Sequence, residues 1–230
     1  MNDTTPPPPP PSPAYPVTFD VEPQLTDRNR MTVAFRIILA IPHLLIVGGP
    51  GIALGGGGYW FERGHPLLRL VSGLPGNGVL GAVAFVMAVI VWFAIVFAGT
   101  HPRGLWDFAR MYMRWRTKAG AYIALFRDEY PPFGEGEYPV TYEVAYPEVP
   151  RDRWSVGLRI FYVIPHAIVL FFLGIAWWIT TVIAWFAILF TGAYPAGLYR
   201  FGVGVMRWNV RVESYVLLMR DEYPPFSMEP

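Results

Sequence analysis

The sequence contains no cysteine and few charged residues. The absence of cysteine in its 230 residues excludes disulfides, thiolate metal sites and cysteine nucleophiles. Only 15% of the residues are charged, against roughly 25% in soluble domains, while 53% are hydrophobic. The net charge of +1 gives no indication of nucleic-acid binding. This composition, with a mean hydropathy of +0.34, predicts a chain whose apolar surface lies in lipid.

The N-terminal segment has neither a basic start nor an apolar run, so it is not expected to be a secretory signal peptide. Its six consecutive prolines favour an extended, solvated conformation. We expect residues 1–14 to form a disordered Pro-rich tail. The tail is interpreted as a spacer in preference to a ligand for a proline-binding module.

The rest of the chain repeats itself. Residues 15–47 match residues 138–170 at an offset of 123, with 13 of 33 positions identical. Residues 92–133 match residues 185–226 at an offset of 93, with 22 of 42 identical. The difference between the offsets predicts a first copy over 15–133 with a 30-residue insertion at about 48–78, and a second copy over 138–226.

Each copy opens with strict alternation of apolar and polar residues, as in Tyr15, Val17, Phe19 and Val21. A period of two predicts a short, half-buried β-strand. Two hydrophobic helices follow in each copy, and we expect them at residues 31–47 and 79–98, and at 154–173 and 175–191. No charged residue occurs from 160 to 192, which predicts a tight helical hairpin that turns near Gly174.

A third helix of another kind ends each copy. Aromatic and aliphatic residues recur at helical spacing on one face, and basic residues lie on another, which is typical of an amphipathic helix in the membrane interface. The expected fold is therefore membrane α-helical. It is a tandem repeat of two transmembrane helices plus an amphipathic interfacial helix, with a short β-strand at the start of each repeat.

The basic residues are unevenly placed along the chain. Of the 18 Lys and Arg residues, only Arg63 and Arg69 fall between the two expected spans of a copy. By the positive-inside rule, both termini are expected to be cytoplasmic and the insertion to be outside. An even number of spans in each copy makes the copies parallel, with a pseudo-twofold axis along the membrane normal.

Several motifs recur in the same order in both copies: YPV, R-x-R, IPH, WFAI followed by G-x-x-P, an aromatic and basic helix, and DEYPPF. In this the chain resembles the bacterial membrane family described as domain of unknown function 4389, which often occurs as two copies. The resemblance covers almost all of residues 15–133 and 138–226 apart from the insertion. It implies a membrane location, and it transfers no catalytic residue.

Two polar pairs fall inside the expected spans. Arg36 and His43 are two helical turns apart, and Arg159 and His166 repeat this spacing. An ionisable residue within a span suggests function, here a proton relay or a lipid phosphate site. The structural interpretation is favoured: the arginines extend to the interface, and the histidines bond carbonyls freed by the nearby prolines.

The basic interfacial helices suit anionic lipid headgroups, because cations attract phosphate and amphipathic rings prefer the interface. Simple topology determination needs the same residues, so both interpretations stay open. The candidate lipid-binding residues are Arg110, Arg114, Trp115, Lys118, Arg207, Trp208 and Arg211.

Other motifs carry little chemistry. Asp128 and Glu129 of DEYPPF are adjacent carboxylates without further oxygen ligands, so a helix-ending cap against the YPVT strand is favoured over a cation site. The four glycines of residues 55–58 lack P-loop context and predict a flexible loop. His65 and His101 have no partners at metal-ligand spacing. We expect no metal, no cofactor and no catalytic site.

Together these patterns predict a non-enzymatic protein of the bacterial inner (plasma) membrane, multi-pass, with both termini cytoplasmic. It is expected to act as an accessory or scaffold protein. Its expected partners are anionic membrane lipids and either a membrane protein or further copies of itself, and no nucleic acid. The alternative function is a small transporter or channel component with a polar site at the repeat axis.

Overall fold

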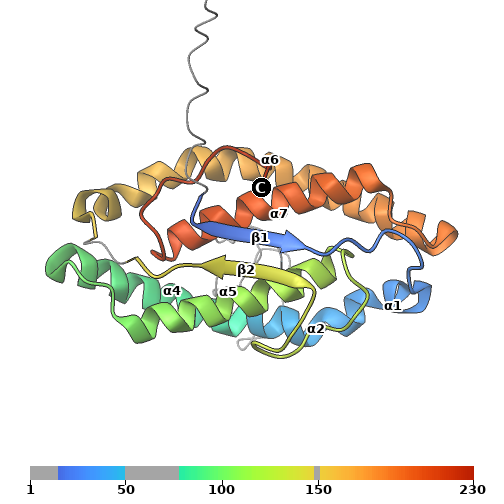
Figure 1. The fold of residues 1–230 in the computed structure, drawn as a ribbon, viewed down its shortest axis with the longest axis horizontal. Helices are drawn as coiled ribbons and strands as arrows, with labels where there is room; N and C mark the ends of the chain where they lie inside the picture. The colour runs from blue at the N-terminus through green and yellow to red at the C-terminus, as the bar shows by residue number, and fades with distance from the viewer. Residues whose placement is uncertain (1–14, 50–77, 148–150) are drawn as a thin grey trace, which may run out of the picture.

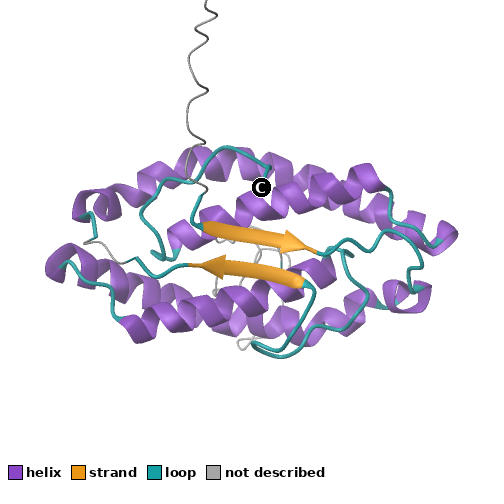
Figure 2. Cartoon of the chain, viewed as in Figure 1, coloured by secondary structure: helices purple, strands orange, loops and turns teal. Residues whose placement is uncertain are grey.

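The computed structural model describes residues 15–49, 78–147 and 151–230. It is mostly helical with one small sheet (Figure 1, Figure 2). The Pro-rich tail, most of the insertion and its glycine run lie outside the described residues. In chain order the elements are β1 (Val17–Val21), α1 (Arg30–Ala34), α2 (Arg36–Val47), α4 (Gly78–Phe93), the π-helix η1 (Ala94–Ala98), α5 (Arg103–Ile123), β2 (Val140–Val144), α6 (Arg153–Thr191) and α7 (Ala196–Val216).

The two strands are the alternating segments that open each copy, so this prediction is confirmed. They pair antiparallel, with Phe19 opposite Tyr142 and Val17 opposite Val144. Phe19 and Tyr142 occupy the same position in the two copies. Because an antiparallel pair has local twofold symmetry, the twofold axis that relates the copies passes between these two residues. Alternate side chains of each strand are buried, as a period of two requires.

The predicted hairpin near Gly174 is wrong. Helix α6 runs unbroken for 39 residues and includes both Pro165 and Gly174. A glycine inside a helix costs only about 1 kcal/mol relative to alanine. The residues around Gly174 are all apolar, so no turn chemistry adds to that cost. The second copy therefore contains one long apolar helix where two were expected.

Helices α2 and α4 correspond to the two halves of α6. Val47 ends α2 and Gly78 begins α4, and their equivalents Leu170 and Phe171 are consecutive in α6. A Cβ built on Gly78 would lie 2.7 Å from the backbone nitrogen of Gly48, so the two helix ends touch. Both halves pack against α5, as α6 packs along α7. The insertion interrupts the helix without separating its halves.

The two copies exchange contacts across the axis. Strand β1 packs on α7 of the second copy, and β2 packs on α5 of the first. The indole of Trp185 donates to the carbonyl oxygen of Val33 (2.9 Å), and the indole of Trp92 donates to that of Val156 (3.1 Å). The main hydrophobic core contains residues from both copies. Neither copy is a separate domain.

Helices α5 and α7 were predicted to be amphipathic helices in the membrane interface, each with a basic face, but the basic face of α7 is covered by protein. Every residue of α7 from Gly202 to Tyr215 is buried. Each of these helices contacts a strand and also an apolar helix, and so separates the sheet from α2, α4 and α6. Their polar residues meet other parts of the protein, because strands and C-terminal segments of the copies cover them.

Candidate functional site

A buried ion cluster joins the start of the first copy to its DEYPPF motif. Arg28 Nη2 lies 2.7 Å from Asp128 Oδ1, and Arg36 Nη2 lies 2.8 Å from the same oxygen. The backbone N–H of Asn29 donates to Asp128 Oδ2 at 2.7 Å. Burial alone would raise the pKa of Asp128, but these hydrogen bonds and the two guanidinium charges hold it below its usual value.

The second copy repeats this cluster. Arg151 Nη2 and Arg159 Nη2 each lie 2.6 Å from Asp221 Oδ1. The pKa of Asp221 is likewise lowered: burial would raise it, but the bonds and charges of the two arginines dominate. The Asp of each DEYPPF motif is therefore committed to arginines of its own copy. This arrangement agrees with a structural cap and leaves no free carboxylate oxygen pair for a cation.

The expectation that Arg36 and Arg159 extend to an interface is wrong. The side chain of Arg36 is 2% exposed, donates to the carbonyl oxygen of Arg127 (2.9 Å) and stacks on the ring of Tyr122. Arg159 donates to the carbonyl oxygen of Tyr215 (2.7 Å) and stacks on its ring. These arginines hold the end of α5 or α7 against the apolar helix.

Each intrahelical histidine lies in an aromatic cage. Trp115 Nε1 donates to His43 Nδ1 (3.0 Å), and Trp208 Nε1 donates to His166 Nδ1 (3.1 Å). Since an indole N–H only donates, Nδ1 carries no proton in this arrangement. His166 stacks on Phe226 with ring centroids 4.0 Å apart. The partner of each histidine is thus a tryptophan, and not a carbonyl freed by proline as expected.

The histidines can be tested for a proton-relay role. Nε2 of both histidines is buried; within the described part of the chain that of His166 has no hydrogen-bond partner, whereas His43 also interacts with the backbone of Pro131. We expect the double variant His43→Gln, His166→Gln to fold, because glutamine can accept the indole hydrogen bond. Its free energy of unfolding, measured by thermal unfolding between pH 5 and 8, should fall below that of the unchanged chain by the same amount at every pH. We expect about 1 kcal/mol for each lost ring contact. A loss confined to one end of that range would instead identify a titrating histidine.

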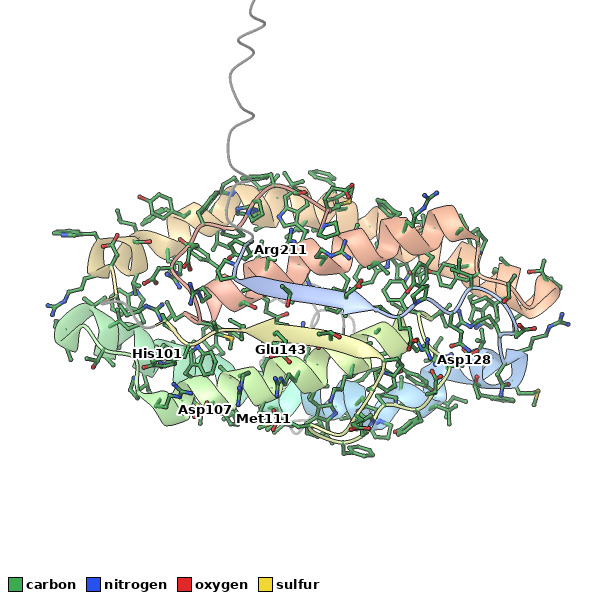
Figure 3. The ribbon with its side chains drawn as sticks, in the orientation of Figure 1. His101, Asp107, Met111, Asp128, Glu143 and Arg211 are labelled. Atoms are coloured by element: carbon green, nitrogen blue, oxygen red, sulfur yellow. The ribbon has the colours of Figure 1, made fainter. Side chains whose placement is uncertain are left out.

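The candidate lipid-binding residues are largely engaged with protein. Arg114 bonds Glu143 at 2.8 Å, and Arg207 donates to the carbonyl oxygen of Phe19 at 3.1 Å. Lys118 is buried against the carbonyl oxygen of Gly136. Trp115 and Trp208 donate hydrogen bonds to the two histidines. Arg211 is buried and lies 3.5 Å from the carbonyl oxygen of Ser227, beside β1 in Figure 3.

Of these seven residues, Arg110, Arg114 and Trp115 are partly exposed. Arg110 lies 3.9 Å from Asp107 on the same helix. A small polar pocket of about 230 Å³ lies beside Arg114, where α5 meets β2. The structure therefore does not gather the seven residues into one open surface, and lipid binding by them stays a prediction.

A buried ion pair was not foreseen. Arg116 Nε lies 2.8 Å from Glu213 Oε1, and Arg116 Nη1 donates to the carbonyl oxygen of Val47 at 2.8 Å. The equivalent positions hold Asn209 and Gly120, so the pair exists once. Val47 ends α2, and its carbonyl has lost the helical partner that the equivalent Leu170 keeps within α6. In the sequence, the signal for this ion pair was that the two copies differ at both of its positions.

The largest apolar surface lies on the long helices. Two segments are long and apolar enough to cross a membrane, Gly78–Ala98 and Arg153–Thr191. On α6, 17 large hydrophobic side chains are exposed, including Trp178 at 69% and Phe190 at 77%. An apolar groove of about 520 Å³ lies between α4 and α6. Within the described part of the chain, no group of three metal-ligating residues occurs.

Comparison with known proteins gives one family. The model of the family described as domain of unknown function (DUF4389) matches residues 68–134 and 153–228. No curated protein and no solved structure matches the chain. Each matched region contains one aromatic and basic helix with its DEYPPF motif, while β1 and β2 lie outside both regions. The chain therefore belongs to the DUF4389 family, and it carries two tandem copies.

Proposed function

We propose that this chain is a non-enzymatic membrane accessory or scaffold protein that is embedded in lipid. The observation that supports it is the exposed apolar surface of α6, together with the absence of charged residues from 160 to 192. Burying a large apolar side chain is worth about 1.5–3 kcal/mol, and monomers in water rarely leave so large a patch open. Its site would be the bacterial inner membrane, with both termini on the cytoplasmic side.

Exposed arginines near the ends of the apolar helices are suited to headgroup phosphates. Arg30 and Arg153 occupy equivalent positions at the start of their copies, and both are exposed. Their guanidinium groups lie beside Gly192 and Gly99, where α6 and η1 end. Such cations attract anionic lipid with roughly 1 kcal/mol each.

The functional proposal is tested by flotation of the purified chain with vesicles. We expect the chain to float with neutral vesicles through its apolar helices and to retain more lipid when phosphatidylglycerol is present. The variant Arg30→Gln, Arg153→Gln should lose most of that anionic preference at low salt, where charge attraction is least screened. A chain that stays at the bottom of the gradient with every vesicle would refute membrane embedding.

A matched variant compares the sequence-based candidates with this pair. In Arg114→Gln, Lys118→Gln, Arg207→Gln, Arg211→Gln, the changed residues bond mainly to protein, so we expect lower thermal stability with little change in lipid preference. The reverse result, a folded protein that loses its anionic preference, would assign headgroup binding to α5 and α7. Mass spectrometry of copurifying lipids and proteins from native membranes would identify the partner.

The alternative function, a transporter or channel component, requires polar groups along the repeat axis. The axis passes between the side chains of Phe19 and Tyr142, which are both buried. The hydroxyl of Tyr142 is bonded to Ser214 Oγ at 2.8 Å. This packed aromatic centre does not favour a translocation path.

A further inference from the structure

Helix α6 is too long for the bilayer it would have to cross. Its 39 residues span roughly 58 Å at 1.5 Å per residue, against a hydrocarbon thickness of about 30 Å. The exposed hydrophobic residues from Leu158 to Phe190 alone extend over roughly 48 Å along the axis. Fitting that length within the hydrocarbon would need a tilt of roughly 50°, beyond the usual range of tilts.

The polar sheet lies midway along the same length. Figure 1 shows β1 and β2 over the middle of the molecule, with their direction along its longest axis. Figure 3 places Glu143 near this middle and Asp128 towards one end. The outward face of the sheet carries exposed carboxylates: the side chain of Asp20 is 77% exposed and that of Glu143 is 58% exposed. The water-facing part of the protein is thus central.

These two facts conflict with a transmembrane orientation. With the long helices upright, the sheet and its carboxylates would lie at the centre of the bilayer. Among the described residues the sheet has two strands, so each strand also has one open edge of backbone groups. Open sheet edges do not occur in hydrocarbon, where no water satisfies them, and carboxylates as exposed as Asp20 and Glu143 are costly there even with an arginine partner.

We propose that the whole molecule lies flat, with its long axis in the membrane plane. Helices α2, α4 and α6 are embedded among the acyl chains of one leaflet, and the sheet faces water. The proposal rests on the proposed membrane function and specifies its geometry. Arg30 and Arg153, at opposite ends of the molecule, then lie at the same depth. The apolar groove between α4 and α6 opens to acyl chains of that leaflet.

Three glycines allow the depth of α6 to be measured. Gly157 and Gly174 lie in α6 and Gly197 follows it in α7, and at each position an added Cβ meets nothing within 4 Å. The chain has no native cysteine, so Gly157→Cys, Gly174→Cys and Gly197→Cys each give one labelling site. Each variant would carry a nitroxide label in vesicles of phosphatidylethanolamine and phosphatidylglycerol. Collision with oxygen and with a water-soluble nickel complex then reports depth.

The flat orientation predicts three labels within about 10 Å in depth, the diameter of a helix. An upright helix would separate Gly157 from Gly174 by roughly 25 Å in depth. Thr18→Cys on the exposed face of β1 supplies the water-facing reference. In sealed vesicles, an impermeant thiol reagent should reach Gly157→Cys and Gly197→Cys from the same side.

The outcomes separate the two proposals. Flotation with equal label depths supports the flat orientation. Flotation with Gly174 much deeper than both ends, or with the two ends reached from opposite sides, overturns the flat orientation and leaves the membrane function standing. A chain that does not float refutes the membrane function itself. Thermal unfolding of each labelled variant verifies that the labels report on the folded protein.

Discussion

Replacing Asp128 by asparagine is expected to lower the free energy of unfolding by about 3–5 kcal/mol, because it leaves two buried guanidinium groups without their counter-charge. The side chain of Arg28 is 0% exposed and that of Arg36 is 2% exposed, so water cannot solvate them in place of the carboxylate. Thermal or denaturant unfolding in detergent measures the loss. Asp221→Asn should give an effect of the same sign in the second copy.

Asp107→Asn is the matched control for this prediction. Asp107 faces Arg103 at 3.6 Å, but its side chain is 43% exposed, so its loss should stay within about 0.5 kcal/mol. Equal effects at Asp107 and Asp128 would show that the buried cluster contributes no more than a surface pair.

The same cluster predicts a pH dependence. The pKa values of Asp128 and Asp221 lie below their usual range in the folded chain, so their stabilisation is complete at neutral pH. It is lost as the pH falls from the unfolded value of about 3.9 through the folded pKa. The salt bridges of Glu129 and Glu222 lower their pKa values against the effect of burial and add a dependence of the same sign. The double variant Asp128→Asn, Asp221→Asn should therefore show a weaker decline in stability below about pH 4.

Glu213→Gln is expected to have the second large effect, a loss of about 3 kcal/mol or more. Glutamine keeps the shape and an acceptor oxygen but removes the charge that Arg116 faces in the core. Asn209 and Gly120, at the equivalent positions of the other copy, form no such pair. Asn209→Ala is the control within α7, and it should cost less because no buried charge depends on it. Equal losses would remove the ion pair from the explanation.

Deleting residues 48–77 tests why this pair exists. The deletion joins Val47 directly to Gly78, as their equivalents Leu170 and Phe171 are joined in the continuous helix α6. We expect the shortened chain to fold, with the Val47 carbonyl bonded within the helix. The double variant Arg116→Asn, Glu213→Ala removes the pair, and it should lower the free energy of unfolding less in the shortened chain than in the full chain. The difference should be about 1–3 kcal/mol, the cost of leaving the buried Val47 carbonyl without a hydrogen bond in the full chain. Because the side-chain cavity is the same in both, an identical loss would show that the Val47 carbonyl does not matter.

The sequence predicted the elements of this fold better than their connections. Tandem offsets and alternation located both strands and both copies, because these signals are local or periodic. The break at Gly174 was wrong because one glycine in an apolar run fits a hairpin and a continuous helix equally. The pairing of Arg28 with Asp128 spans 100 residues, and no local pattern contains it. The sequence signal for this pairing was that both residues recur in the second copy.

The contacts of the candidate site were missed for the same reason: they join residues that lie far apart in the sequence. Spacing placed Arg36 and His43 on one helix face, but it could not show that Asp128 and Trp115 complete their contacts. Basic residues of α7 suggested a wet surface, since helical spacing alone does not show which face a strand of another copy will cover. The ion pair of Arg116 and Glu213 was missed because it joins positions that differ between the copies.

The exchange of strands between the copies has an evolutionary consequence. Tyr15 of the first copy donates to the carbonyl oxygen of Glu222 in the second, and Tyr138 of the second donates to that of Glu129 in the first. An ancestor with one copy could satisfy these contacts only by assembling as a symmetric homodimer. Two copies in one chain are free of the requirement that both halves be identical. The insertion after Val47 is in the first copy alone, and the pair of Arg116 and Glu213 has one member in each copy. An obligate homodimer could not confine such changes to one subunit.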